Sequence, residues 1–468
     1  MYKIFGHYIP KPLLLLGFTE SVILFISVYI GVAISIGVGV HGFGRYSNPL
    51  MTHAMLFCGV MFVAMAAMGL YRRDLRDQFI TVCLRIFLSL LIGFLILYGF
   101  YLIYPDTFFN RNVFLVGVLC AFMGIMFCRL LWYTRKDTYL KRVMVVGTGE
   151  KAQQLEGLRR KTDRIGIDIV GYIDMAGSCK QAVHENRIVK RVNGKPFHYA
   201  EFFEQNGIDE IVIALDERRQ NFPTDDILEA KMRGVHVIDV NTFLERQVGK
   251  INLDTLRPSN FIYSDGFTQN PLKTVNKRIL DVAASSVLLF LAAPVMVLTA
   301  LAIWFESGCK GSIIYRQERV GRNNGIFQLM KFRSMQENAE QDGKPQWASK
   351  NDSRVTSVGR FIRKTRIDEL PQLFNVLKGD MSFVGPRPER PQFVEDLEDK
   401  LPYYAERHMV KPGITGWAQI NYPYGASIED SRHKLEYDLY YAKNYTPFLD
   451  LLILLQTLRV VLWHEGAR

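Results

Sequence analysis

Two adjacent carboxylates, Asp368 and Glu369, are the residues of this sequence whose type and spacing could do chemistry. They open the stretch DELPQLFNVLKG. Proline is tolerated in the first turn of a helix and glycine is favoured beyond its end, so Pro371 and Gly379 predict a short helix with both acids at its N-terminus. That end binds anions and keeps a carboxylate ionised. Successive helical residues point about 100° apart, so one acid can attack a substrate while the other holds a metal.

Cations lie close to the two acids in the sequence. Arg363 and Arg366 come just before them. The stretch YRQERVGRNNGIFQLMKFRSM (315–335) adds Lys331 and Arg333, and its basic residues alternate with apolar ones as in a strand. Alternation places cations on one face, where they suit phosphate oxygens. Helix capping, at about 1 kcal/mol, would explain the acids but not these cations.

The elements that must position these residues include membrane helices. Four apolar runs approach or exceed the roughly 20 residues of a spanning helix: 13–40, 50–70, 79–104 and 113–133. The first run is too long for a cleaved signal peptide, and three more follow it. Basic residues gather in loops 71–78 and 134–142, so both ends of this unit are predicted to face the cytoplasm. Glu20 lies near the cytoplasmic end of the first run, which favours an interfacial or helix-paired carboxylate over a transport path.

A fifth apolar run, 279–305, is long enough to cross a bilayer, but Pro294 in its middle kinks the helix. Basic residues flank both of its ends, so both ends prefer the cytoplasm. A re-entrant helix that dips into one leaflet and returns satisfies them. The alternative, a fifth spanning helix, would carry the C-terminal third across the membrane. We also expect FLDLLILLQTLRVVLW (448–463) to lie along the membrane surface as an amphipathic helix.

The middle of the chain has the pattern of a soluble α/β domain. KRVMVVGTGEKAQQLEGL begins with an apolar strand, and Gly147, Gly149 and Ala152 form a G-x-G-x-x-A turn of the dinucleotide-binding type. Asp174 ends the next strand, where a ribose-binding acid would lie. Alternating strands and helices predict a parallel, doubly wound sheet. Because the fingerprint alone is a weak signal, a regulatory or assembly domain with a vestigial site is favoured over functional nucleotide binding.

Composition excludes other classes of function. The net charge of +11 suits either nucleic acid or an anionic membrane surface with phosphorylated substrates. The apolar runs favour the membrane, so no nucleic-acid partner is predicted. The 6 cysteines form no CxxC pair and the 9 histidines no HxH or HxxxH pair, which argues against a disulfide framework and a zinc site.

From about residue 276 onward the chain resembles the polyprenyl-phosphate hexose-1-phosphate transferases, the monotopic phosphoglycosyl transferase superfamily of bacterial envelope synthesis. The matching stretches are KRILDVAASS, YRQERVG, MKFRSM, DELPQLFNVLKGDMSFVGPRP, KPGITGWAQIN and EYDLYYAKN. Four N-terminal helices and a Rossmann-like insert are similar to the large members, and VGPRPERPQF resembles those of exopolysaccharide loci. Ala293-Pro294 departs from the Ser-Pro of smaller members. The kink should survive, but any serine hydroxyl bond to the backbone is lost.

The resemblance implies transfer of a sugar 1-phosphate from a UDP-sugar to undecaprenyl phosphate, with Mg²⁺ and release of UMP. This would be the initiating step of exopolysaccharide, capsule or O-antigen repeat-unit synthesis, at the cytoplasmic face of the bacterial inner membrane. The resemblance suggests glucose or galactose as the sugar. It leaves open whether the protein forms a homo-oligomer. Asp368 would be the nucleophile and Glu369 would help to hold Mg²⁺. The other predicted substrate-site residues are Lys331, Arg333, Arg363, Arg366, Arg387 and Asp438.

The expected fold is a membrane protein of mixed class with four parts. They are four transmembrane helices (1–140), a Rossmann-like α/β domain (141–250), a linker (251–275) and an α/β catalytic domain with the re-entrant helix (276–468). Every predicted substrate contact lies in the last part, so that part alone is expected to retain some activity. Two other functions fit the sequence less well. A membrane-anchored sugar-nucleotide oxidoreductase or sensor is disfavoured because this chain has no Tyr-x-x-x-Lys pair after the fingerprint. A transporter is disfavoured because only one acid of this chain lies deep within the four helices.

Overall fold

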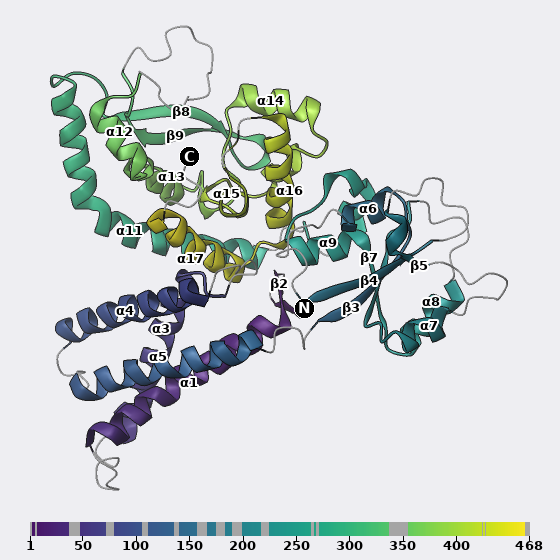
Figure 1. Ribbon diagram of the computed structural model, residues 1–468. Helices are drawn as coiled ribbons and strands as arrows, with labels where there is room; N and C mark the ends of the chain where they lie inside the picture. The colour runs from purple at the N-terminus through teal and green to yellow at the C-terminus, as the bar shows by residue number, and fades with distance from the viewer. Residues whose placement is uncertain are drawn as a thin grey trace. The chain divides into compact units, whose positions relative to one another are not determined.

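The structure is a computed structural model (Figure 1). It describes residues 2–4, 7–36, 47–71, 79–104, 111–134, 140–156, 166–174, 183–189, 199–216, 224–263, 266–267, 271–336, 354–423, 425 and 427–463. The chain divides into two compact units. One comprises Met1–Ile4 and Tyr8–Val248, and the other comprises Phe5–His7 and Gly249–Arg468.

The first unit begins with a short β-ribbon and the predicted apolar helices (Figure 1). The ribbon and helices are β1 (Tyr2–Ile4), β2 (His7–Ile9), α1 (Lys11–Ile36), α3 (Ser47–Ala67), α4 (Phe79–Ile103) and α5 (Arg111–Thr134). All four helices are long and apolar enough to cross a membrane, which confirms the prediction of a membrane protein. The membrane orientation is predicted from the charged loops, and most of their residues, 72–78 and 135–139, lie outside the described residues.

Glu20 is paired within this helical unit. The Nε atom of Arg129 lies 2.5 Å from Glu20 Oε1, and Nη2 lies 3.1 Å from Oε2. Arg129 Nη1 also donates to the carbonyl of Leu70, and both charged side chains are buried. A buried charge is tolerated where it is paired and hydrogen-bonded. The acid therefore joins α1 to α5, as expected for a helix-paired carboxylate.

The α/β part of the first unit is a doubly wound parallel sheet, as predicted. Its 5 strands run in the order β5-β4-β3-β6-β7. The strands and helices are β3 (Lys141–Val146), α6 (Glu150–Glu156), β4 (Ile167–Ile173), β5 (Ile188–Val189), α7 (Tyr199–Gln205), β6 (Glu210–Ile213), α8 (Thr224–Met232), β7 (His236–Asp239) and α9 (Val240–Val248). Val143 and Val145 pack toward α6 and α9, whereas Met144 and Val146 pack toward α7 and α8, because successive strand residues face opposite sides.

The second unit begins at Gly249 and holds both predicted carboxylates. Its elements are η4 (Leu253–Thr255), α10 (Pro258–Tyr263), α11 (Pro271–Glu306), β8 (Ile314–Val320), β9 (Ile326–Phe332), α12 (Ser357–Lys364), η6 (Ile367–Glu369), α13 (Gln372–Lys378), β10 (Ser382–Val384), α14 (Pro391–Lys400), η7 (Ala405–Met409), β11 (Gly413–Thr415), α15 (Trp417–Asn421), α16 (Ile428–Asn444) and α17 (Pro447–Trp463). Strands β8 and β9 form an antiparallel hairpin, and β10 pairs with β11 in parallel.

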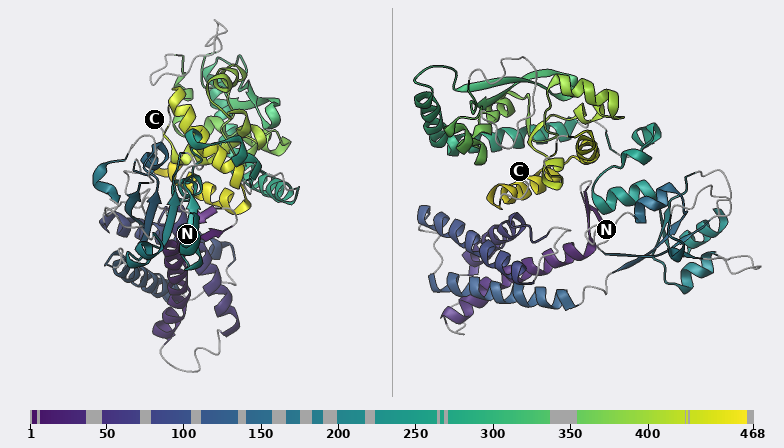
Figure 2. Two further views of the ribbon diagram at one scale, coloured as in Figure 1. Left: turned by 90° about the vertical axis from the view of Figure 1, so that its right-hand side faces the viewer. Right: turned by 45° about the horizontal axis from the view of Figure 1, so that its top comes forward.

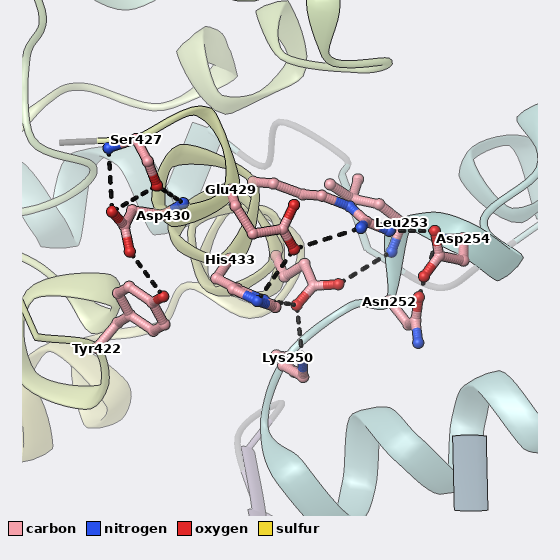
Figure 3. A network of polar contacts seen from close by, with 11 residues as sticks. Lys250, Asn252, Leu253, Asp254, Tyr422, Ser427, Glu429, Asp430 and His433 are labelled. Carbon is pink, nitrogen blue, oxygen red and sulfur yellow. Dashed lines mark hydrogen bonds and ion pairs between the residues drawn. The ribbon is translucent and has the colours of Figure 1, made fainter. Parts of the chain in front are cut away.

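At the start of the segment 251–275, expected to be a linker, residues contribute to the core of this unit. Ile251 and Leu253 are buried in the same cluster as residues of α13 and α16. Figure 3 shows the polar contacts that hold the segment against α16, including an ion pair of 2.6 Å between Lys250 Nζ and Glu436 Oε2. Asp254 pairs with Arg432 on the same helix. Composition does not distinguish an exposed linker from an irregular segment that packs against the domain, whereas the tertiary contacts do.

Helix α11 is long, and it is bent rather than straight, as Figure 1 and the right-hand view of Figure 2 show. Pro294 lies inside it. A straight helix of 36 residues would extend roughly 54 Å. Both ends nevertheless contact the same unit, because Lys277 Nζ donates to the Val384 carbonyl and Glu306 accepts a 3.0 Å bond from the amide of Val358. Apolar side chains between the two ends are exposed.

Candidate active site

The two acids lie in a single turn of 3-10 helix, η6, that directly precedes α13. Gly379 ends α13 with φ of 100°, the left-handed conformation that favours glycine. The predicted short helix is present, but the acids come just before it rather than inside it. Arg366, with φ of 60°, lies between α12 and η6. A non-glycine residue in this region is uncommon, and such strain is often found at functional sites.

Glu369 is surrounded by cations. Its Oε1 atom lies 3.2 Å from Lys331 Nζ, 3.0 Å from Arg387 Nη2 and 3.6 Å from Arg366 Nη1. Burial would raise the pKa of Glu369, but these three cations outweigh it and hold the pKa well below its usual range. The carboxylate therefore stays ionised at any physiological pH.

Asp368 has a different environment. Its side chain is 8% exposed, and its buried Oδ1 has no hydrogen-bond partner within the described part of the chain. Burial and the neighbouring Glu369 raise the pKa of Asp368, while Lys331, Arg366 and Arg363 oppose that rise. A buried oxygen without a partner is costly unless a ligand satisfies it. Paired acids with opposite pKa shifts are typical of sites that divide their chemistry between two carboxyl groups.

Lys331, Arg363 and Arg387 reach the acids from separate elements, whereas the described residues show no contact between Arg333 and the acids. Lys331 is on β9, opposite Tyr315 of β8, so the predicted strand is present. Arg387 lies in the Gly-Pro-Arg-Pro turn after β10, and its Nη1 atom also donates to Gln419 at 3.2 Å. Arg363 on α12 is near enough for its charge to lower the pKa of Asp368. Arg333 follows β9, where its amide donates to Ile313 at 2.9 Å.

Asp438, a predicted substrate-site residue, is paired with a cation of this chain. Its carboxylate is 2% exposed and accepts two hydrogen bonds from Arg407, at 3.1 Å from Nε and 2.7 Å from Nη2. This carboxylate holds the Arg407 side chain in place. Sequence reasoning missed Arg407, because no local pattern links it to an acid on another element.

The N-terminal arm of α11 holds the elements around the acids. Arg278 donates to the carbonyls of Val376 at 2.6 Å and Leu377 at 2.5 Å, which lie at the C-terminal end of α13. A cation at that end of a helix is favourable. Asp281 accepts 2.9 and 3.0 Å bonds from the Ser382 hydroxyl and the Phe383 amide in β10. These anchors also escaped sequence reasoning, since they lie in what reads as the flank of an apolar run.

The glycine turn of the α/β domain has the predicted backbone. Gly147, with φ of 125°, donates its amide to Ile173 at 2.9 Å, and Ala152 is fully buried against the sheet. At Gly149 an added Cβ would lie 1.8 Å from Oδ2 of Asp216. The absence of a side chain at Gly149 therefore makes room for a carboxylate of this same chain.

The Asp216 carboxylate occupies the place where a pyrophosphate would bind in a dinucleotide-binding turn. It accepts hydrogen bonds from the amides of Glu150 at 2.9 Å and Lys151 at 3.1 Å, in the first turn of α6. The predicted ribose acid, Asp174, accepts a 2.9 Å bond from the Thr148 hydroxyl. The residues present do not fit a phosphate group at this turn, because the negative charge of the Asp216 carboxylate would repel the phosphate.

A magnesium site can also be tested against the donors present. The described residues contain no group of three His, Cys, Asp or Glu side chains placed to hold a metal. Mg²⁺, however, is commonly bound by one or two carboxylates together with substrate phosphates and water. The buried Oδ1 of Asp368 without a partner and the ionised Glu369 beside it fit a site of that kind.

Two family models match the chain. Residues 272–464 match the bacterial sugar transferase model, and residues 66–221 match a model described as a CoA-binding domain. The first match contains α11 and both acids.

Three similar proteins illustrate the match with known sequences. A UDP-N-acetylgalactosamine-undecaprenyl-phosphate N-acetylgalactosaminephosphotransferase of Aeromonas hydrophila is 43% identical over 234 residues, which cover 50% of this chain and 54% of the relative. A UDP-glucose:undecaprenyl-phosphate glucose-1-phosphate transferase of Klebsiella pneumoniae is 32% identical, with 78% of each chain covered. An undecaprenyl-phosphate galactose phosphotransferase of Salmonella typhimurium is 29% identical, over 77% of this chain and 76% of the relative.

Proposed function

Because the chain belongs to the bacterial sugar transferase family, we propose that it transfers a sugar 1-phosphate from a UDP-sugar to undecaprenyl phosphate and releases UMP. The names of the relatives support this donor and acceptor. They mention glucose, galactose and N-acetylgalactosamine, so the sugar is taken to be one of these. The observation that carries the proposal is the contrast between Asp368, with its unpartnered oxygen, and Glu369, held by three cations.

In the first step, an oxygen of the Asp368 carboxylate attacks the phosphorus next to the sugar. The new bond is an acyl phosphate, and the bond from that phosphorus to the bridging oxygen of the diphosphate breaks. The electron pair leaves with UMP. Lys331, Arg366 and Arg387 lie beside the acids, where they would neutralise phosphate oxygens as charge moves onto the leaving group. Positioning and charge neutralisation of this kind supply most of the catalysis in phosphoryl transfer.

In the second step, a phosphate oxygen of undecaprenyl phosphate attacks the acyl phosphate. The bond to Asp368 breaks, its carboxylate is restored, and the lipid carries the sugar diphosphate. A carboxylate nucleophile thus divides one transfer between two anionic substrates into two displacements. Burial of Asp368 favours the first step, because a poorly solvated carboxylate is a stronger nucleophile.

Mg²⁺ is proposed as the cofactor, held by Glu369 and by the diphosphate of the donor. When bound, it would supply positive charge next to the phosphate oxygens. The cations on Glu369 contact its Oε1 atom and keep the carboxylate ionised, which is the form that binds a metal.

The lipid acceptor requires Asp368 to lie near a bilayer surface. We propose that α11 is a re-entrant helix, with its exposed apolar middle in one leaflet and both ends on the cytoplasmic side of a bacterial inner membrane. Its bend and the attachment of both ends to one unit support this arrangement. The anchors Arg278 and Asp281 then set the depth of α13 and β10, and so that of the acids.

The proposed reaction uses no residue of the α/β domain. Its family model is described as CoA-binding, but Asp216 already occupies the turn where a phosphate would lie. A regulatory or assembly role for this domain remains our expectation.

The test is release of UMP by the purified full-length protein with Mg²⁺, undecaprenyl phosphate and UDP-glucose, UDP-galactose or UDP-N-acetylgalactosamine in turn. We expect UMP and a lipid diphosphate sugar from at least one donor. Failure with all three, by protein that is folded and embedded in a bilayer, would overturn the proposal.

A further inference from the structure

Arg407 is a buried guanidinium that links three groups. It is 5% exposed, and its Nε and Nη2 atoms donate to Asp438. Its Nη1 atom donates to the Tyr404 hydroxyl at 2.8 Å, and Nη2 also donates to the backbone carbonyl of Arg387 at 2.9 Å. Because a guanidinium is planar and rigid, fixing it on Asp438 also fixes where the other donors point.

Arg387 continues this chain of bonds into the active site. Its backbone is held by Arg407, while its own guanidinium lies 3.0 Å from Glu369. The turn that carries it lies between Pro386 and Pro388, which have no amide donors. Gly413 donates to the Pro386 carbonyl and Arg319 to the Pro388 carbonyl, and the bond from Arg407 fixes the Arg387 carbonyl between them.

We propose that Asp438 and Arg407 are positioning residues: the buried pair holds the Arg387 backbone so that the Arg387 guanidinium reaches Glu369 and the substrate phosphates. This rests on the proposed function for its catalytic consequence. Asp438 touches no phosphate in this arrangement. Its negative charge, which would repel a diphosphate, is instead neutralised by Arg407.

Helix α16 offers a matched control two residues away. Glu436 is also a buried carboxylate, 3% exposed, and it pairs with Lys250 at 2.6 Å. It also accepts a bond from the Leu253 amide, within the packed segment seen in Figure 3. Glu436→Gln therefore removes a buried charge from the same helix without touching Arg407 or Arg387.

The kinetic test is a double-mutant cycle in the full-length protein, with kcat and KM measured from UMP release. Positioning predicts that Asp438→Asn lowers kcat/KM by about 10- to 100-fold in the wild type, and by less than about 3-fold when Arg387 is already alanine. Glu436→Gln should cost less than about 3-fold in both backgrounds. Equal losses from Asp438→Asn in both backgrounds would mean that Asp438 acts directly, and would overturn the proposal.

A second measurement needs no turnover. Hydrogen exchange followed by mass spectrometry reports the amides of Gly385, Arg387 and Glu389. Asp438→Asn should speed exchange in this turn, whereas Glu436→Gln should leave it unchanged. If the wild-type protein releases no UMP, the proposed function fails while this comparison still decides the positioning role.

A conservative variant guards against loss of the fold. Arg407→Lys keeps a cation beside Asp438, but a single ammonium cannot reproduce the planar fork that spans Asp438 and the Arg387 carbonyl. We expect a folded protein with faster exchange in the 385–389 turn and a lower kcat/KM. Unchanged exchange in Arg407→Lys and in Asp438→Asn would overturn the proposal.

Discussion

Asp368 and Glu369 are neighbours in the chain, yet their carboxylates lie in opposite electrostatic environments. Three cations lie beside Glu369 and lower its pKa, whereas burial raises the pKa of Asp368. The same turn of 3-10 helix holds both, and one Asp368 oxygen has no partner among the described residues. This asymmetry is the reason to assign attack on phosphorus to Asp368 and metal binding to Glu369.

The first prediction concerns the covalent step. Without a lipid acceptor, the protein should release UMP in a burst no larger than its own concentration and carry one sugar phosphate on Asp368. Asp368→Asn keeps the shape but removes the nucleophile, so burst and adduct should vanish and turnover should fall by roughly 10³-fold or more. Intact-protein mass spectrometry and UMP analysis measure both.

Glu369→Gln is the companion variant for that experiment. It should weaken the response to Mg²⁺ while any remaining adduct stays on Asp368. An adduct found on Glu369, or full activity in Asp368→Asn, would show that the two roles are assigned wrongly.

The second prediction concerns pH. Asp368 must be ionised to attack, and its folded-state pKa is raised, so activity should be lost as pH falls through a value above the roughly 3.9 of a free aspartate. Arg366 opposes that rise, so Arg366→Ala should move this acid limb to higher pH. Rates of the UMP burst measured against pH give the limb. Lys364→Ala, which removes an exposed cation from the end of α12, should leave it in place.

The third prediction concerns the boundary of the catalytic unit. A chain that starts at Gly249 keeps Lys250, Ile251 and Leu253, which pack on α16 and in the core. We expect it to unfold at a clearly higher temperature than a chain that starts at residue 276. It should also retain more UMP-releasing activity. Equal thermal stability of the two truncated proteins in the same detergent would contradict the role of this segment.

The fourth prediction tests the re-entrant helix. In a cysteine-free protein, single cysteines replace Leu272, in the first turn of α11, and Lys310, which follows the end of α11 at Glu306. Both should react with a membrane-impermeant thiol reagent in inside-out vesicles, and neither in right-side-out vesicles. Labelling of the two positions from opposite sides would establish a fifth spanning helix instead.

The fifth prediction concerns the glycine turn of the α/β domain. The Asp216 carboxylate accepts hydrogen bonds from the amides in the first turn of α6. Calorimetric titration of the full-length protein with CoA should therefore show no binding at this turn. Asp216→Ala should lower the stability of the domain by about 1 kcal/mol, the usual cost of losing a helix cap. Tight CoA binding that Gly149→Val abolishes would contradict this prediction.

The sequence by itself determined the local elements of this protein. Apolar runs predicted the membrane helices, alternating strands and helices predicted the parallel sheet, and Pro371 with Gly379 marked the helix beside the two acids. Each of these follows from side-chain size, hydrophobicity and backbone preference within a few residues, so neighbours in the chain are sufficient to specify it. Arg366 is near Glu369 for the same reason, because it comes three residues before it in the chain, whereas Lys331 and Arg387 reach Glu369 from other elements.

Only the tertiary structure decided which polar groups meet. Asp438 pairs with Arg407, Asp216 fills the turn that its glycines leave open, and residues just after Gly249 pack into a core. These partners lie far apart in the chain, and a buried charge can be satisfied by any suitably placed partner. No local pattern specifies which one, because the choice depends on where the packed helices and strands bring the side chains together.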